Sequence, residues 1–171
     1  MLSARGWLGL ATAIVVLDQL AKYAVLKSFA VGEAVAITPF VNLVLVYNPG
    51  AAFSFLSDQA GWQRWLFIGI ALAASAWIVH LLVNRPRERL FALALTLVLA
   101  GALGNVIDRI VYGAVVDFAD FHAWGHHWPA FNIADSAITC GAVLLIWDAL
   151  FPRKPHGFDG EAQRGEEGAA K

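Results

Sequence analysis

Charge is scarce in this sequence: Lys, Arg, Asp and Glu together form 15% of its 171 residues, well below the level of about 25% in soluble domains. The net charge is −1 and no basic stripe alternates with aromatic residues, so nothing predicts a nucleic-acid partner. Neither a Walker loop nor a G-x-S-x-G element is present, which argues against P-loop NTPases and serine hydrolases. Cys140 is the single cysteine. It cannot form an internal disulfide framework, and we expect its thiol to be a small buried hydrophobic group.

Long apolar runs dominate the chain, which is 59% hydrophobic with a mean hydropathy of +0.63. Each run approaches the ~20 residues that an α-helix needs to cross the hydrocarbon core. We expect four membrane-spanning helices, at about residues 6–27, 63–83, 90–112 and 133–151. They would form one membrane-embedded domain, 1–151, followed at 152–171 by a tail whose composition predicts disorder. The first run resembles a cleavable signal peptide, but its length, its internal Asp18 and Lys22, and the lack of a small-x-small exit site favour a retained helix.

The distribution of Lys and Arg predicts how the chain crosses the membrane. The two long loops, residues 28–63 and 113–132, contain neither Lys nor Arg. Positive residues occur before the first run, in the short second loop and after the last run: Arg5, Arg85, Arg87, Arg89, Arg153, Lys154, Arg164 and Lys171. Because positive charge is retained on the cytoplasmic side, both termini are expected to be cytoplasmic and both long loops outside.

The two outer loops have different patterns. The first contains AVAITPFVNLVLVYNPGAAFSFL, residues 34–56, whose strand-forming and turn residues predict a small β element on the outer membrane surface. The second carries Trp124 and Trp128 and predicts a short interfacial segment, because indole rings settle among lipid headgroups. Three histidines also lie there, with H-x-x-x-H-H spacing: His122, His126 and His127. No further ligand motif accompanies them, so we expect a loop role and no metal.

Charges inside the apolar runs need partners, because a lone charge at a helix centre costs about 2.5–3.5 kcal/mol. Asp18 and Lys22 are four residues apart on one helix face, which predicts an ion pair, with snorkelling of Lys22 as the alternative. In the third run, small and polar residues recur at three- and four-residue steps: Gly101, Gly104, Asn105, Asp108 and Arg109. Such a stripe lets helices approach and hydrogen-bond, and we interpret Asp108 beside Arg109 as an internal or interfacial ion pair.

Asp117 and Asp135 form the pair with the clearest chemical potential. Asp117 follows the outer end of the third run and Asp135 opens the fourth, so the predicted topology brings both to one membrane face. Two nearby carboxylates cannot both ionise cheaply, so one stays protonated and the pair supplies an acid and a base. Helix capping is the alternative, because Asn132, Asp135 and Ser136 all suit a helix N-terminus. That helix end would favour ionised Asp135 and leave Asp117 protonated.

Five segments, in this order, resemble the lipoprotein signal peptidase family, also called signal peptidase II or prolipoprotein signal peptidase. They are DQLAK at 18–22, YNPGAAFSF at 47–55, GALGNVIDR at 101–109, VVDF at 115–118 and FNIADS at 131–136. The similarity covers about residues 7–151. Any one motif would be a weak signal, whereas five in register are specific.

The resemblance implies a bacterial inner-membrane aspartic endopeptidase that removes the signal peptide from prolipoproteins whose cysteine carries diacylglycerol. It implies Asp117 and Asp135 as catalytic residues at the periplasmic face, with no cofactor and no metal. It also implies supporting positions around the site: Asp18, Lys22, Asn48, Gly50, Asn105, Asp108, Arg109, Asn132 and Ala134. Family members are inhibited by the peptide antibiotic globomycin. We expect Phe53, Phe55 and the Trp-rich second loop to clasp the substrate in contact with membrane lipids.

The polar residues by themselves leave other classes open. A small proton-coupled transporter also carries Asp, Lys and Arg in membrane helices, although it would place carboxylates at mid-membrane and often shows inverted repeats, which this sequence lacks. A purely structural assembly factor is the third alternative. With the resemblance included, the sequence predicts a four-helix membrane endopeptidase with a small outer β element.

Overall fold

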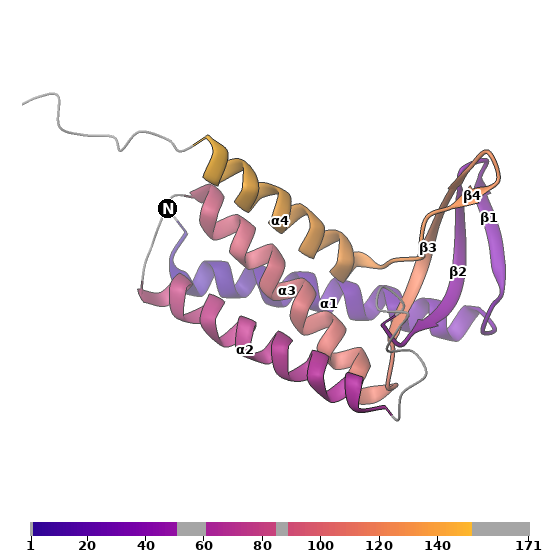
Figure 1. The fold of residues 1–171 in the computed structure, drawn as a ribbon, viewed down its shortest axis with the longest axis horizontal. Coiled ribbons are helices and arrows are strands. Elements are labelled where there is room, and N and C mark those ends of the chain that lie inside the picture. The colour runs from indigo at the N-terminus through magenta and orange to yellow at the C-terminus, as the bar shows by residue number, and fades with distance from the viewer. Residues whose placement is uncertain (1, 51–60, 85–88, 152–171) are drawn as a thin grey trace, which may run out of the picture.

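The computed structural model describes residues 2–50, 61–84 and 89–151. Within them, helices and strands follow in the order shown in Figure 1: α1 Ala4–Ser28, β1 Ala34–Thr38, β2 Val41–Asn48, α2 Trp62–Asn84, α3 Arg89–Val111, β3 Val115–Ala123, β4 His126–His127 and α4 Ile133–Leu150. Phe53, Phe55 and the tail at 152–171 lie outside the described residues.

The four helices are each long and apolar enough to cross a membrane. They contain 25, 23, 23 and 18 residues, so even the shortest approaches the ~20 residues required. In α3, 56% of the most apolar window is buried, against 17–22% in the other three helices. The expected fold of membrane helices with a small sheet is therefore confirmed, and α3 is the central helix that the others surround.

Close packing around α3 depends on glycine. A Cβ built on Gly104 would lie 2.8 Å from Asp18 Oδ2 of α1 and 3.1 Å from the Cβ of Ala134 in α4. A Cβ on Gly101 would overlap the Ala134 carbonyl and the Ile138 side chain. The absence of side chains at these two positions lets α3 bring its polar residues against α1 and α4, as small residues do between membrane helices.

The strands form one antiparallel sheet in the order β1-β2-β3-β4. Figure 1 shows this sheet lying across one end of the helix bundle. In the pairing of β2 with β3, Asn42 lies opposite Asp120 and Val46 lies opposite Asp117, with a register shift between Leu43 and Val46. Near the site end of the sheet, Val116 is fully buried and packs with Val25 of α1. The sheet is thereby fixed to the C-terminal end of α1.

The segment between α3 and α4 differs from the expectation of a short interfacial segment. It supplies the nine-residue strand β3 and the short strand β4, and Phe131 pairs with Ala119 just before α4. Val115, Val116, Phe118 and Phe121 favour a strand in this segment, and β2 provides the partner. Sequence reasoning weighed the tryptophans of this loop and overlooked the strand pattern beside them.

Cys140 corrects another expectation. Its side chain is exposed on α4 and is not a buried core group. The apolar side chains Val143, Ile146 and Trp147 on the same helix are also 56–60% exposed. In a membrane helix, exposed positions contact lipid, so the thiol is a small hydrophobic group on the lipid-facing surface.

Candidate active site

A buried ion triad lies where α1 and α3 meet. Lys22 Nζ lies 2.8 Å from Asp18 Oδ2 and 2.7 Å from Asp108 Oδ2, and it donates to Asn105 Oδ1 at 3.2 Å. All three charged residues are 0–1% exposed. The expected pair of Asp18 and Lys22 is confirmed, and Lys22 does not snorkel. Because the ammonium group has an acceptor for each of its three donors, its burial is compensated.

The expected pair of Asp108 with Arg109 is not formed. Asp108 bonds with Lys22, whereas Arg109 donates from Nη1 to the backbone oxygen of Asn105 at 3.3 Å. The Arg109 guanidinium lies 5.3 Å from the centre of the Phe67 ring in α2. Neighbouring residues on a helix point about 100° apart, so Asp108 faces α1 and Arg109 faces α2.

The two acids of the triad also fix backbone groups. Asp18 Oδ1 accepts the N–H of Ala134 at 2.9 Å, and Asp108 Oδ2 accepts the N–H of Val116 at 3.1 Å. Ala134 immediately precedes Asp135, and Val116 immediately precedes Asp117. A single ion triad therefore anchors the backbone next to each of the two aspartates of interest.

Asp117 lies on β3 with its carboxyl group buried and 1% exposed. Its Oδ1 accepts the amide of Asn132 at 2.7 Å, and its Oδ2 accepts the amide of Asn48 at 2.9 Å. The Asn48 side-chain oxygen in turn accepts the N–H of Gly50 at 2.9 Å. The segment between α1 and α2 thus contributes one of the two side chains that orient Asp117.

Asp135 lies in the first turn of α4 and has two structural roles. One oxygen completes a capping box with Asn132, whose backbone N–H donates to Asp135 Oδ2 at 3.3 Å. The other oxygen accepts the Asn105 amide of α3 at 2.8 Å. The capping alternative is therefore correct for Oδ2, while Oδ1 faces the polar centre of the site.

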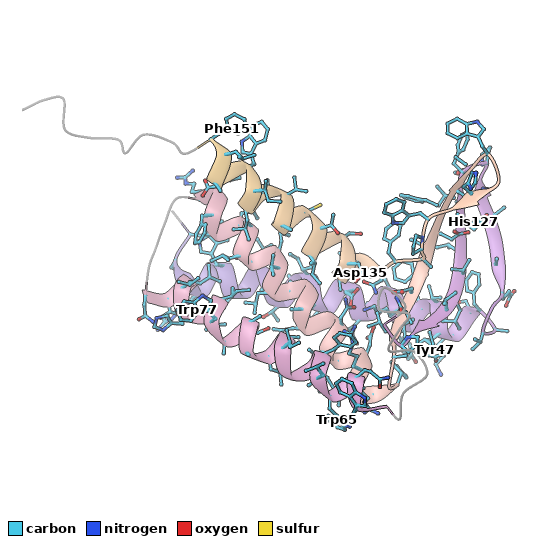
Figure 2. The ribbon with its side chains drawn as sticks, in the orientation of Figure 1. Tyr47, Trp65, Trp77, His127, Asp135 and Phe151 are labelled. Atoms are coloured by element: carbon cyan, nitrogen blue, oxygen red, sulfur yellow. The ribbon has the colours of Figure 1, made fainter. Side chains whose placement is uncertain are left out.

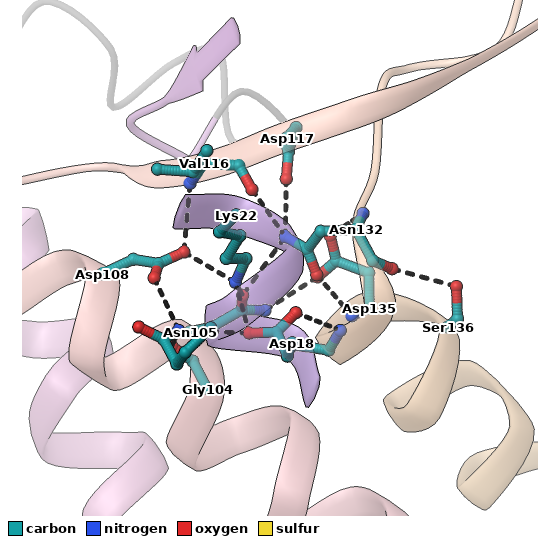
Figure 3. A network of polar contacts seen from close by, with 12 residues as sticks. Asp18, Lys22, Gly104, Asn105, Asp108, Val116, Asp117, Asn132, Asp135 and Ser136 are labelled. Carbon is teal, nitrogen blue, oxygen red and sulfur yellow. Dashed lines mark hydrogen bonds and ion pairs between the residues drawn. The ribbon is translucent and has the colours of Figure 1, made fainter. Parts of the chain in front are cut away.

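Asn132 connects the two aspartates, as Figure 3 shows. Its side-chain nitrogen donates to Asp117 Oδ1 and to the backbone oxygen of Val116, and its side-chain oxygen accepts the N–H of Asp135 at 2.9 Å. The structure thus brings together nine predicted positions: Asp18, Lys22, Asn48, Asn105, Asp108, Asp117, Asn132, Ala134 and Asp135. Figure 2 places Asp135 at the end of the bundle beside the sheet, far from Trp77 and Phe151 at the other end.

The electrostatics of the two aspartates are unequal. The pKa of Asp117 is raised from 3.8 to about 7, chiefly by burial and also by the charge of Asp135, against the hydrogen bonds from Asn48 and Asn132. Asp135, by contrast, sits at a helix N-terminus and accepts a backbone N–H. The site can therefore hold a proton on Asp117 near neutral pH.

Sequence reasoning missed Gln19 and Phe67. Gln19 Nε2 donates to Asp108 Oδ1 at 2.9 Å and to the Gly104 oxygen at 3.2 Å, so it joins α1 to α3 beside the triad. Phe67 lies beneath Gly50, where an added Cβ would come within 2.9 Å of its ring, and Gly50 has a φ of +117°. The polar Gln19 within DQLAK was a usable signal, whereas nothing in the sequence connected Phe67 to Gly50.

The three histidines of the sequence motif lie on the sheet, away from Asp117 and Asp135. His127 Nδ1 lies 2.9 Å from Asp120, which also accepts the Asn42 amide at 2.8 Å. Burial opposes ionisation of Asp120, but these hydrogen bonds hold its pKa below the usual value. His122 stacks on His127 with ring centres 5.0 Å apart. Within residues 2–50, 61–84 and 89–151, no three His, Cys, Asp or Glu side chains are grouped to hold a metal ion.

Comparison with known proteins identifies the family. The family described as signal peptidase (SPase) II matches residues 10–151. Lipoprotein signal peptidases of Ralstonia nicotianae and Burkholderia mallei are 61% and 58% identical over 144 residues, covering 84% of this chain and 83% and 87% of the relatives. A solved structure described as a bacterial membrane enzyme has 34% identity and a TM-score of 0.75, and covers 86% of this chain and 94% of its own. The chain therefore belongs to the signal peptidase II family and is an aspartic-type membrane protease of lipoprotein processing.

Proposed function

We propose that this chain cleaves the signal peptide from diacylglyceryl-modified bacterial prolipoproteins, with Asp117 and Asp135 activating the attacking water. Family membership supports signal-peptide cleavage from prolipoproteins and favours it over the two other functions considered, a proton-coupled transporter and an assembly factor. The residues that perform the reaction are inferred from the site's geometry. The observation that carries the inference is that Asn132 hydrogen-bonds to both aspartates across two different elements.

The unequal surroundings of the two aspartates support different roles for them in the proposed reaction. Asp135, as the ionised member, removes a proton from water as its oxygen attacks the scissile carbonyl carbon. Asp117, as the protonated member, donates its proton toward the oxygen of that carbonyl. When the tetrahedral intermediate collapses, the carbon–nitrogen bond breaks, and the proton taken up by Asp135 passes to the leaving amine of the lipid-modified cysteine. In the same step, the hydroxyl group that Asp117 had protonated returns its proton to Asp117. Its C=O bond re-forms as part of the new carboxyl group of the signal peptide.

The supporting residues hold this arrangement in place. Asn105, Asn48 and Asn132 orient the carboxyl groups by direct hydrogen bonds. The ion triad acts indirectly, through the N–H groups of Val116 and Ala134. A catalytic pair needs this kind of support, because misplacement by about 1 Å is enough to cost about two orders of magnitude in rate.

The membrane topology follows from the charges of the loops. The loops that surround the two aspartates contain no Lys or Arg, whereas the other ends of the helices do. We place both termini in the cytoplasm and the aspartates at the periplasmic face of the inner membrane. Substrates would then arrive from the outer leaflet with their lipid still embedded. A peptide antibiotic of the globomycin type is expected to compete for the same site.

The test compares purified wild type with Asp117→Asn and Asp135→Asn on a diacylglyceryl-modified prolipoprotein in detergent. Asn preserves the shape of the side chain and removes its acid–base function. Asp148→Asn is the matched control, because Asp148 also lies on α4 but near its opposite end. Wild type and Asp148→Asn should cleave, and the other two variants should not.

The outcomes separate the parts of the proposal. Cleavage by both Asp117→Asn and Asp135→Asn, with folding intact by thermal unfolding, would reject the two-aspartate mechanism while leaving the protease assignment. Failure of wild type on a lipid-modified substrate, with cleavage of a non-lipidated one, would reject the substrate class. Protease protection of tags at the two termini tests the topology separately.

A further inference from the structure

The first turn of α2 carries a positive charge that its own helix disfavours. Arg64 follows Trp62 and Gln63 at the start of α2, and no acidic residue lies in that turn. A helix N-terminus carries partial positive charge, so a cation there is unfavourable. Figure 2 shows the neighbouring Trp65 at the end of the bundle that also holds Asp135. A charge that conflicts with a local rule near the candidate site indicates a role outside its own helix.

The partner of Arg64 is the C-terminal end of α3. Arg64 Nη2 donates to the backbone oxygen of Ile110 at 3.0 Å, and Ile110 lies in the last turn of α3, which ends at Val111. The last carbonyl groups of a helix have no partner within that helix and carry partial negative charge. The charge that is unfavourable at the start of α2 is therefore favourable at the end of α3.

The same guanidinium group lies beside the turn that leads from α3 to Asp117. Gly113 follows the end of α3 in a left-handed conformation, with a φ of +83°, and a Cβ built on it would lie 3.5 Å from Arg64 Nη1. Strand β3 begins two residues later. Asp108 holds the N–H of Val116 at 3.1 Å. The connection is thus restrained by Arg64 where it leaves α3 and by the ion triad where it reaches β3.

The position of the Arg64 side chain is not that of an arginine extended toward water. Its Cζ lies 4.9 Å from the centre of the Trp65 ring. Its Nε is buried and has no hydrogen-bond partner among the residues that the structure describes. A buried, unpaired N–H costs free energy, whereas long cationic side chains near a helix end commonly turn their charged group toward water. The contact with Ile110 is kept although one nitrogen loses its solvent.

We propose that Arg64 is a positioning residue for Asp117: from α2 it fixes the end of α3 and the turn at Gly113, and thereby sets where β3 presents the carboxyl group. This role rests on the proposed function, in which Asp117 is catalytic. Asn132 and Asn48 hold the carboxyl group by direct hydrogen bonds. Arg64 supplies a restraint from α2 that acts through the backbone, without touching the reacting atoms.

An effect of position and an effect of charge would shift the pKa of Asp117 in opposite directions. The charged groups that act on Asp117 include Asp135 of α4, Lys22 of α1 and Arg109 of α3. If Arg64 acted through its charge, its removal would raise the pKa of Asp117, because a nearby cation favours the carboxylate. If Arg64 acts through position, its removal lets a carboxyl group that is 1% exposed reach water. That change lowers the pKa, because burial is the largest cause of its raised value.

The test compares Arg64→Gln with wild type as the full chain in detergent. Infrared titration of the protonated carboxyl band of Asp117, identified by its loss in Asp117→Asn, reports the surroundings of this group without any substrate. The pH profiles of kcat and KM on a diacylglyceryl-modified prolipoprotein report the consequence for the reaction. Arg89→Gln is the matched control, because Arg89 also lies in the first turn of a membrane helix, at the opposite end of α3 from Ile110.

The expected result is a loss of turnover together with a shift in titration. Arg64→Gln should lower kcat by about tenfold or more with little change in KM, because a misplaced reacting group is costly. Asp117 should titrate at a lower pH than in wild type, and the decline of kcat with rising pH should move in the same direction. Arg64→Lys should be intermediate, since an ammonium group can reach one carbonyl oxygen but does not reproduce the planar guanidinium. Arg89→Gln should match wild type.

Gly113→Ala perturbs the same turn without removing a charge, and it serves as the second variant if Arg64→Gln does not fold. A side chain is strained at the positive φ of Gly113, so this variant should also lower kcat and the pH at which Asp117 titrates. Gly125→Ala is its control, because Gly125 has a φ of +78° with nothing within 4 Å of the added Cβ and follows the opposite end of β3. Equal behaviour of the two alanine variants would mean that the turn does not control Asp117, and would overturn the proposal.

Three results for folded Arg64→Gln would also overturn it. Wild-type kcat with an unchanged titration of Asp117 would leave the arginine without influence on the site. Titration at a higher pH would show that its charge acts directly. A raised KM with wild-type kcat would show contact with the substrate. If wild type cleaves no prolipoprotein, the proposed function fails, and the infrared titration still decides whether Arg64 positions Asp117.

Discussion

Asn132 Nδ2 lies 2.7 Å from Asp117 Oδ1. This contact links the N-cap of α4 to the start of β3, so one side chain both starts a membrane helix and orients a carboxyl group on another element. Capping and catalysis appeared as alternatives in the sequence. In the folded chain the same residue performs the capping and positions the proposed catalytic group.

Asn132→Ser should separate these two roles. A serine oxygen still accepts the Asp135 N–H and keeps the cap, but it provides no amide for Asp117. We expect the Tm to stay near that of wild type and kcat to fall about tenfold, because a hydrogen bond of about 1 kcal/mol or more is lost at the reacting group. Asn132→Ala is the control and should also lose about 1 kcal/mol of stability with the cap. Wild-type turnover by Asn132→Ser would remove this residue from the site.

The buried carboxyl of Asp117 should make activity depend on pH. Its pKa is raised from 3.8 to about 7, chiefly by burial. The proposed mechanism needs this group protonated when water attacks, so kcat should decline as pH rises through about 7. A pH profile of kcat for wild type checks this. A kcat that increases through the same range would reverse the proposed roles of Asp117 and Asp135.

The same group should affect stability in a defined direction. Its folded-state pKa lies above the unfolded value, so between about pH 4 and about pH 7 the folded protein binds more protons than the unfolded chain. The stability that this carboxyl contributes is complete below that window and is lost as pH rises through it. Asp117→Asn has no such dependence. The stability of the variant relative to wild type should increase by up to about 1.4 kcal/mol per pH unit across the window, which thermal unfolding in detergent measures.

The sequence was most informative where short-range rules apply. Apolar run length predicted the four membrane helices, and the four-residue spacing of Asp18 and Lys22 predicted their ion pair. Each of these two predictions uses only the residues of a single helix. The meeting of Asp117 and Asp135 at one end of the bundle followed from counting membrane crossings.

Contacts between elements were less predictable. Adjacent Asp108 and Arg109 suggested an ion pair. In the structure, the way α3 faces its neighbours places Asp108 in an ion pair with Lys22 of α1 and the Arg109 guanidinium over the Phe67 ring of α2. Strand β3 was missed because its pairing with β2 joins residues separated by two helices in the sequence. Helix facing and long-range strand pairing depend on packing, which composition and local periodicity do not specify.

Lys22→Met should destabilise the fold strongly. It would leave Asp18 and Asp108 facing each other without the ammonium group, and both are buried. Removing one member of a buried ion pair costs about 3–5 kcal/mol. Lys27→Met is the control at the end of α1, where the exposed Lys27 lies 5.5 Å from the centre of the Tyr23 ring, and it should cost about 1 kcal/mol or less. Adding Asp108→Asn to Lys22→Met should recover part of the loss. No recovery in thermal unfolding would contradict the charge-based explanation.

Gly104→Ala tests whether close approach of α1, α3 and α4 is needed for activity. The new methyl group would lie 2.8 Å from Asp18 Oδ2 and 3.1 Å from the Ala134 side chain. Overpacking of this kind costs about 1–3 kcal/mol. Because Asp18 holds the backbone next to Asp135, the displacement should also lower kcat. Gly69→Ala in α2 is the matched control, since nothing lies within 4 Å of its added Cβ, and the higher helix propensity of Ala should leave stability unchanged or raise it by up to about 1 kcal/mol. Equal Tm and kcat for the two variants would mean that α3 can shift away from α1 without disturbing the aspartates, and would remove the link between helix packing and the site.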